Sequence, residues 1–140
     1  MQQTIEGLQK QKGYLFKKLG EVGNFRRGTI SVNYRKCGKK NCVCTKEGHP
    51  GHGPQYLWST TLKGKSLTKN LRLGPELQKY KEDIDNYHQF QRLCNEIIQK
   101  NEQLCNLQPV ARIEDTNELE ELKKNLQRYF LKKYKKRLSG

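Results

Sequence analysis

Three cysteines and two histidines lie within sixteen positions of one short stretch, CGKKNCVCTKEGHPGHGP, which spans residues 37–54. Zinc prefers thiolate and imidazole ligands, usually four of them in a tetrahedron. Glycines within the stretch allow a short backbone segment to turn around a single ion. The residue types and their spacing therefore predict a structural zinc site made of three cysteines and one histidine.

The fourth ligand of this site can be chosen in two ways, because His49 and His52 both follow the cysteines. His52 stands between two glycines and leads directly into a segment expected to be a strand, which would fix its position. We favour Cys37, Cys42, Cys44 and His52 as the zinc ligands, and His49 remains the alternative.

Redox and catalytic uses of the same residues are less well supported. No C-x2-C pair is present, and a Cys-x-Cys pair is poorly placed to form an unstrained disulfide. A cysteine nucleophile with a histidine base would leave two thiols without a role. The basic half of the chain also lacks the clustered acids of a Mg²⁺-dependent nuclease. We therefore expect that the protein is not an enzyme.

The charge of the chain is strongly asymmetric. Of 28 Lys and Arg residues and 14 acids, residues 1–74 contain 15 bases and 3 acids, whereas residues 75–140 contain 13 and 11. A solubility device would be spread over the whole surface, so an excess in one half favours a polyanionic partner. We predict nucleic acid as that partner, with DNA favoured over RNA, and an acidic protein or membrane surface as the alternative.

The candidate phosphate-binding residues are cations that flank the expected strands and the Cys/His stretch, where hydroxyl donors accompany them. Trp58 and at least one tyrosine are expected to form the small core, although aromatic side chains can also stack on bases. The candidate phosphate-binding cations are Arg26, Arg27, Arg35, Lys36, Lys39, Lys40, Lys63, Lys65, Lys69 and Arg72.

The elements that must position these residues follow from hydrophobic periodicity. Residues 2–22 have apolar side chains at steps of three and four, which predicts a helix. Alternating patterns predict strands at 29–34, 55–62 and 66–73, the last two joined by a turn at Lys63-Gly64. We expect a small three-stranded antiparallel sheet into which the zinc loop is inserted.

A long helix should begin at Pro75 and run for about thirty residues, since proline suits the first helical position. Either the first helix packs along it as an antiparallel hairpin, or helix 75–106 self-associates with a second copy as a coiled-coil dimer. We assign its apolar seam to Leu77, Tyr80, Ile84, Tyr87, Cys94, Ile98 and Cys105.

The helical pattern breaks at Pro109, and a last amphipathic helix should begin near Asp115. We therefore predict an α+β fold with a zinc-loop and hairpin domain at 1–108 and a C-terminal helix at 109–140. No apolar run is long enough to span a membrane and no secretory signal is evident. We expect a cytoplasmic protein with no membrane partner, for which association with the nucleoid is compatible.

One family resemblance is carried by RRGTISVNYRKCGKKNCVC, by GHGPQYLWS and by a following helix with Y-x6-Y-x2-F-x2-L. This pattern resembles a family of short, uncharacterised prokaryotic zinc-knuckle proteins with a C-G-K-x-x-C-x-C … H-G-P motif, often encoded beside transposases. The resemblance implies the same four ligands, Cys37, Cys42, Cys44 and His52. Gln55 and Lys40 depart from the family pattern, at positions where an aromatic residue and a proline are usual.

Together these observations predict a zinc-stabilised nucleic-acid-binding protein. The resemblance adds a role accessory to a mobile-element enzyme or to its regulation. The alternative is a coiled-coil protein–protein adaptor in which the zinc knuckle is purely structural.

Overall fold

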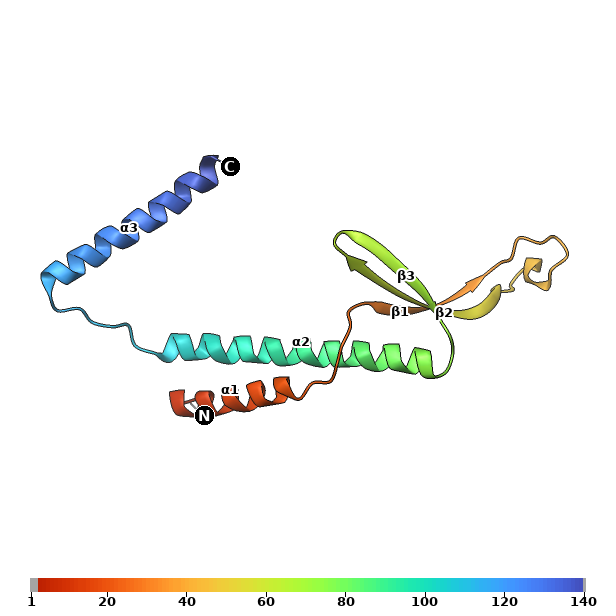
Figure 1. Cartoon of the computed structure of the whole chain (residues 1–140), viewed down its shortest axis with the longest axis horizontal. Helices are drawn as coiled ribbons and strands as arrows, with labels where there is room; N and C mark the ends of the chain where they lie inside the picture. Colours follow the sequence, from red (N-terminus) through yellow and green to blue (C-terminus); the bar gives the residue numbers. More distant parts are fainter. Residues whose placement is uncertain (1–2, 140) are drawn as a thin grey trace. The chain divides into compact units, whose positions relative to one another are not determined.

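A computed structural model describes residues 3–139 of the chain, which divides into two compact units with their boundary after Cys105. The first unit contains a helix, a three-stranded sheet and most of a long helix; the second contains the C-terminal helix (Figure 1). This arrangement confirms the predicted α+β fold. Whether residues 1–108 and 109–140 behave as separate domains stays a prediction. In order, the elements are α1 (Ile5–Gly20), β1 (Thr29–Arg35), η1 (Val43–Thr45), β2 (His52–Leu62), β3 (Lys65–Leu71), α2 (Pro75–Leu107) and α3 (Thr116–Ser139).

The first helix, α1, begins with a capped turn. The side chain of Thr4 accepts a hydrogen bond from the backbone N–H of Gly7 at 3.0 Å, which satisfies one of the free donors of the first turn. Leu15 of α1 packs with Leu93 and Ile97 of α2. The two helices run antiparallel beside each other (Figure 1), which is the first of the two predicted arrangements of the long helix.

The predicted apolar seam of α2 is wrong in its C-terminal half. Ile98 is 51% exposed and Cys105 is exposed, while Cys94 is only partly buried. The helix has instead turned its larger aliphatic side chains toward α1, because leucine and isoleucine remove more apolar area from water than cysteine does. The buried residues of this half are Leu93, Ile97 and Leu104.

The sheet has the strand order β1-β2-β3, with both pairs antiparallel. Leu62 pairs with Lys65 across a two-residue turn in which Lys63 has φ 51° and Gly64 has φ 78°. Positive φ at both central residues is the type I′ geometry that matches the twist of the strands. The hairpin predicted at Lys63-Gly64 is therefore confirmed.

The segment between α1 and β1 is tied to α2 by ring stacking and by hydrogen bonds. Phe25 stacks on Phe90 with ring centroids 4.7 Å apart. The side-chain amide of Asn86 donates to the carbonyl of Asn24 at 3.0 Å. These contacts fix the point at which the chain leaves the helical hairpin and enters the sheet.

The C-terminal helix α3 begins where the sequence predicts. Asp115 accepts hydrogen bonds from the backbone N–H groups of Asn117 and Glu118 at 2.8 and 3.3 Å, as an N-terminal cap does. Within residues 3–139, no helix is both long and apolar enough to cross a bilayer.

Candidate metal centre

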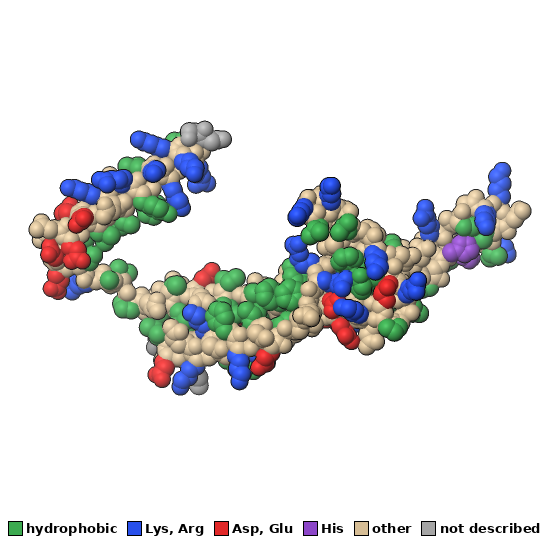
Figure 2. All heavy atoms as spheres, viewed as in Figure 1, with side chains coloured by type: hydrophobic (Ala, Val, Ile, Leu, Met, Phe, Trp, Pro, Cys, Tyr) green, Lys and Arg blue, Asp and Glu red, His purple; other side chains and the backbone are tan. Residues whose placement is uncertain are grey.

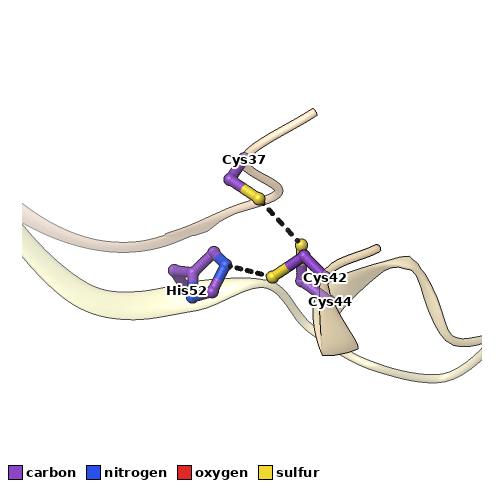
Figure 3. Close-up of side chains that lie close together, drawn as sticks. All are labelled: Cys37, Cys42, Cys44 and His52. Carbon is purple, nitrogen blue, oxygen red and sulfur yellow. Dashed lines mark hydrogen bonds between the residues drawn. The ribbon is translucent and has the colours of Figure 1, made fainter. Parts of the chain in front are cut away.

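The chain brings the four predicted ligands together at the end of the sheet (Figure 3). Cys37 follows β1, Cys42 precedes the short helix η1, and Cys44 lies within η1. His52 is the first residue of β2, where it pairs with Arg35 of β1. Strand pairing thus holds His52 next to the segment that carries Cys37.

Local hydrogen bonds fold the segment between Cys37 and His52. The carbonyl of Cys42 accepts from the backbone N–H of Thr45 at 3.1 Å and from its hydroxyl at 2.7 Å. The backbone N–H of Cys42 donates to the carbonyl of Lys39 at 3.3 Å. These turns bring Cys42 and Cys44 back toward the end of the sheet.

Gly51 allows the loop to return closely against β1. Its φ is +109°, a conformation that other residues rarely adopt, and a Cβ atom there would lie 2.7 Å from the carbonyl carbon of Arg35. Only glycine fits this approach without displacing the backbone. The position of His52, the next residue, depends on it.

The ligand atoms of the cluster fit a tetrahedral ion. All four lie within 4.8 Å of one another. The Cys37 and Cys44 sulfurs are 3.5 Å apart, and the Cys42 sulfur is 3.0 Å from Nε2 of His52. A zinc ion with Zn–S bonds of about 2.3 Å needs sulfur–sulfur edges of roughly 3.8 Å, so only small shifts separate this geometry from a closed site.

Hydrogen bonds within the cluster move the pKa values of Cys42 and His52 in opposite directions. A hydrogen bond with the backbone of Cys44, followed by hydrogen bonds with the Cys37 and Cys44 thiols, lowers the pKa of Cys42 to about 6. Hydrogen bonds to Cys37 and Cys42 raise the pKa of His52. For Cys44, a backbone hydrogen bond from Cys37 lowers the pKa, but burial and the neighbouring thiols outweigh it and raise the pKa overall.

Access to the cluster is from one side. Cys44 is fully buried at 0% exposure, whereas Cys37 and His52 are exposed. A surface groove of about 440 Å³ beside them is also lined by Arg35, Lys36 and Gln55. The site is thus closed beneath by η1 and open toward a basic rim.

His49 is used differently from His52. Its Nδ1 accepts a hydrogen bond from the backbone N–H of Gly51 at 2.9 Å. Within the part of the chain that the structure describes, His49 does not belong to the group of converging ligand atoms. The geometry therefore supports His52 as the fourth ligand and gives His49 a role in shaping the loop.

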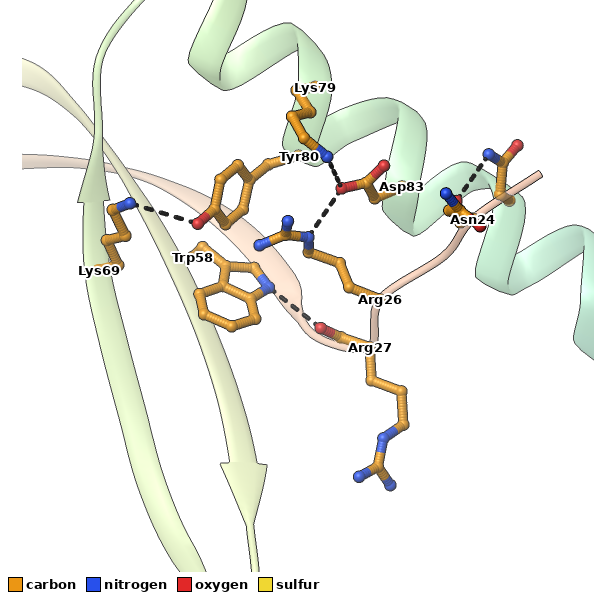
Figure 4. Close-up of polar contacts among 9 residues, drawn as sticks. Asn24, Arg26, Arg27, Trp58, Lys69, Lys79, Tyr80 and Asp83 are labelled. Carbon is orange, nitrogen blue, oxygen red and sulfur yellow. Dashed lines mark hydrogen bonds and ion pairs between the residues drawn. The ribbon is translucent and has the colours of Figure 1, made fainter.

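Two of the predicted phosphate-binding cations make contacts inside the protein (Figure 4). Arg26 donates to Asp83 of α2 at 2.9 Å, and its guanidinium lies 3.7 Å from the centre of the Tyr80 ring. Lys69 lies 3.3 Å from the Tyr80 hydroxyl and 3.9 Å from Glu76. These two cations tie the sheet to α2.

Trp58 packs between the sheet and α2, as the sequence predicts, but it is only partly buried and does not belong to the buried core. Trp58 packs edge-to-face on Tyr80 with centroids 5.3 Å apart, and its indole N–H donates to the carbonyl of Arg27 at 3.1 Å. The sequence analysis missed Asp83 as the partner of Arg26. No local signal identifies it, because fifty-seven residues separate the two side chains.

The other predicted cations lie on the sheet, its turn and the metal-cluster loop. Lys63 forms part of the hairpin turn and Arg35 ends β1, while Arg72 follows β3. In Figure 2, blue Lys and Arg side chains lie near the purple histidine atoms and at several places over the sheet region. The structure brings these cations to one module, although not to a single face of the sheet.

The comparisons with known proteins identify one family. A family model described as a domain of unknown function (DUF6788) matches residues 5–82, which is more than half of the chain. The matched region includes α1, the sheet, all four converging ligands and the start of α2. No curated protein and no solved structure matches the chain.

Proposed function

We propose that this chain, which belongs to the DUF6788 family, is a zinc-stabilised nucleic-acid-binding protein. The family is described only as a domain of unknown function, so the support comes from the residues of this chain. The role is binding rather than catalysis. As the sequence resemblance suggests, the protein would act as an accessory to a mobile-element enzyme or to the regulation of that enzyme.

The observation that carries the proposal is the set of unneutralised cations on the sheet and loop. Residues 23–74 contain eleven Lys and Arg residues and a single acid, Glu47. Arg26 and Lys69 form ion pairs with α2. Within the described residues the other nine form none, and such a concentration of one sign attracts a polyanion. These nine are Arg27, Arg35, Lys36, Lys39, Lys40, Lys46, Lys63, Lys65 and Arg72.

Cys37, Cys42, Cys44 and His52 would bind the zinc ion, and the ion would hold the loop between them, which carries three of these cations. Three thiolates and one Zn²⁺ sum to one negative charge, so neighbouring lysines such as Lys36 and Lys39 would be favourable there. Bound zinc would supply folding free energy to a loop of 14 intervening residues that has few other anchors. Its role in the proposal is structural.

The outer face of the sheet supports contact with a sugar–phosphate backbone. Cross-strand pairing places Trp58 and Lys69 on the face that meets α2, and the adjacent positions on the opposite face. That outer face has hydroxyl or amide side chains at nine of ten positions and no charge, which suits hydrogen bonds to phosphate and base edges. The ten residues are Thr29, Ser31, Asn33, Gln55, Leu57, Ser59, Thr61, Ser66, Thr68 and Asn70.

Size favours duplex DNA over duplex RNA as the target. Three strands spaced at about 4.8 Å span roughly 10 Å between the outer backbones. The major groove of B-form DNA is about 12 Å wide and admits a two-stranded β-ribbon such as the β2–β3 hairpin, whereas that of A-form RNA is deep and narrow. A sheet with a polar outer face and cations at its two ends fits the groove of DNA better.

Binding to labelled oligonucleotides at several salt concentrations tests the proposal. Each phosphate contact contributes about 0.9 to the log–log slope on duplex DNA, so a slope steeper than roughly −4 is expected. Duplex DNA, duplex RNA and single strands are compared, and duplex DNA should bind most tightly. The absence of binding at low salt, or binding that ignores salt, would overturn the proposal.

An acidic protein partner is the second candidate, because the same excess of cations in residues 23–74 would attract it. The double substitution Lys63→Glu/Lys65→Glu separates the two functions, because both side chains lie at the hairpin tip away from the metal cluster. Loss of oligonucleotide binding with unchanged capture of a protein partner supports the first. The reverse pattern supports the adaptor.

A further inference from the structure

The helix α3 exposes a broad apolar stripe. A helix gains most of its stability in water from burying such a stripe, so a long stripe that its own unit leaves open indicates a binding surface. Leu119 is the only partly buried member. The others are between 40% and 70% exposed: Leu122, Leu126, Tyr129, Phe130, Leu131, Tyr134 and Leu138.

The central part of the stripe is symmetric about its middle. Leu119 and Leu138 are equally far from a midpoint near Arg128, and so, within one residue, are Leu122 and Tyr134. Leu126 and Phe130 flank the midpoint. If a second α3 lay alongside in the opposite direction about this midpoint, Leu122 would lie opposite Tyr134 and Leu126 opposite Phe130, which forms an apolar centre for the contact.

The charges of α3 change sign along the same axis. Its first turns carry Glu118, Glu120 and Glu121, and its last turns carry Lys133, Lys135, Lys136 and Arg137. This order suits the dipole of the helix itself. In an antiparallel pair it also places the acidic end of each helix beside the basic end of the other, whereas a parallel pair would place like charges together.

We propose that α3 is a self-association helix, which pairs antiparallel with α3 of a second copy about a two-fold axis near Arg128. The contact is isologous, since each copy uses the same surface. It differs from the predicted self-association through helix 75–106, whose buried face α1 already covers in part. The inference does not depend on nucleic-acid binding.

A dimer of this kind would place two basic sheet modules on one particle. Two linked modules raise the effective concentration of the second on a target that carries two sites. The link between α2 and α3, residues 108–115, sets how far apart the modules can reach.

Sedimentation of the full chain, with matched charge-reversed variants, tests the pairing. The wild type should sediment as a dimer of the 16.4 kDa chain at tens of micromolar. One variant reverses the acidic end (Glu118→Lys/Glu120→Lys) and another the basic end (Lys133→Glu/Arg137→Glu). Each alone should dissociate at least tenfold more readily, and an equimolar mixture should restore the dimer. A monomeric wild type, or a mixture no tighter than the separate variants, overturns the proposal.

The direction of the pairing is tested by a photocrosslinker. Asn117→benzoylphenylalanine in the full chain should crosslink to residues 135–139 of the second copy. Crosslinks to residues 114–121 of the second copy would contradict antiparallel pairing, and crosslinks within one chain would show that α3 packs on its own copy instead. Circular dichroism of each variant ensures that a lost dimer does not reflect a lost helix.

Discussion

The sulfur of Cys42 lies 3.0 Å from Nε2 of His52, although ten residues separate them in the chain. Two features produce this contact: η1 turns Cys42 back toward the sheet, and the pairing of Arg35 with His52 holds the histidine at the start of β2. The metal cluster and the sheet are therefore one structural unit. A substitution that disturbs the sheet should therefore alter the geometry of the metal cluster, and loss of the cluster should loosen the adjacent end of the sheet.

Gly51→Ala should weaken metal binding without removing a ligand. The new methyl group would lie 2.7 Å from the carbonyl carbon of Arg35, and φ of +109° is unfavourable for alanine. We expect zinc affinity to fall at least tenfold, as measured by competition with a chromophoric chelator. Gly13→Ala is the matched control, because that glycine lies in α1 with open space around it, so zinc affinity should not change.

Removing zinc should loosen one part of the protein and leave another intact. Hydrogen exchange measured with and without a chelator should show faster exchange in residues 36–54, where the loop depends on the cluster. The packing of Leu15 with Leu93 and Ile97 contains no ligand, so exchange in α1 and in the middle of α2 should remain slow. Uniformly faster exchange would mean that zinc supports the whole unit.

Arg26→Ala should destabilise the junction between the sheet and α2. The guanidinium is lost both from Asp83 and from the face of Tyr80, so the free energy of unfolding should decrease by about 1–3 kcal/mol. Urea denaturation followed by tryptophan fluorescence measures this, since Trp58 lies at the same junction. Arg27→Ala, whose side chain has no such contacts, should change stability by less than about 0.5 kcal/mol.

Acid should remove the contribution of Asp83. A hydrogen bond from Lys79 lowers the pKa of Asp83, burial opposes it, and Arg26 lowers the pKa further; the side chain is only 13% exposed. Because the folded pKa lies below the unfolded value of about 3.9, this stabilisation is complete above that value and is lost as pH falls through the folded pKa. The difference in unfolding free energy between wild type and Asp83→Asn should stay constant from about pH 7 to 5. It should then shrink below about pH 4; a constant difference to pH 3 would contradict the assignment.

Neutralising cations outside the ion pairs should lower the salt dependence of binding stepwise. Lys63→Gln/Lys65→Gln should reduce the log–log slope on duplex DNA by about 2, or one for each lost phosphate contact. Lys10→Gln/Lys12→Gln on α1 makes the same charge change outside residues 23–74, and should leave the slope nearly unchanged. Equal effects of the two pairs would show that net charge alone, and not the sheet and loop, determines binding.

The fold could be predicted where local patterns decide it. The Lys63-Gly64 turn and the Pro75 helix start follow from backbone chemistry that tertiary contacts do not override. The seam of α2 could not be assigned as reliably. Two apolar series one residue apart, through Leu93 and through Cys94, both fit a helix, and the position of α1 decides between them.

In the candidate site, too, local spacing could be predicted from the sequence and contacts between distant residues could not. The spacing of the cysteines identifies three ligands, but the contact of His49 with Gly51 depends on how the loop folds. Charge counting identifies the basic half of the chain and cannot tell which cations have internal partners. Arg26 and Asp83 meet only because the segment after α1 continues along α2 in the direction of α1.

Zinc content of the purified full chain, measured by elemental analysis beside its His52→Ala and His49→Ala variants, tests the central claim most directly. The account predicts one zinc ion per chain for the wild type and for His49→Ala. It predicts a loss of at least 100-fold in zinc affinity for His52→Ala, because the tetrahedron then lacks its fourth protein ligand. A wild-type chain that binds no zinc, or a His52→Ala variant that binds zinc as tightly as the wild type, would contradict it.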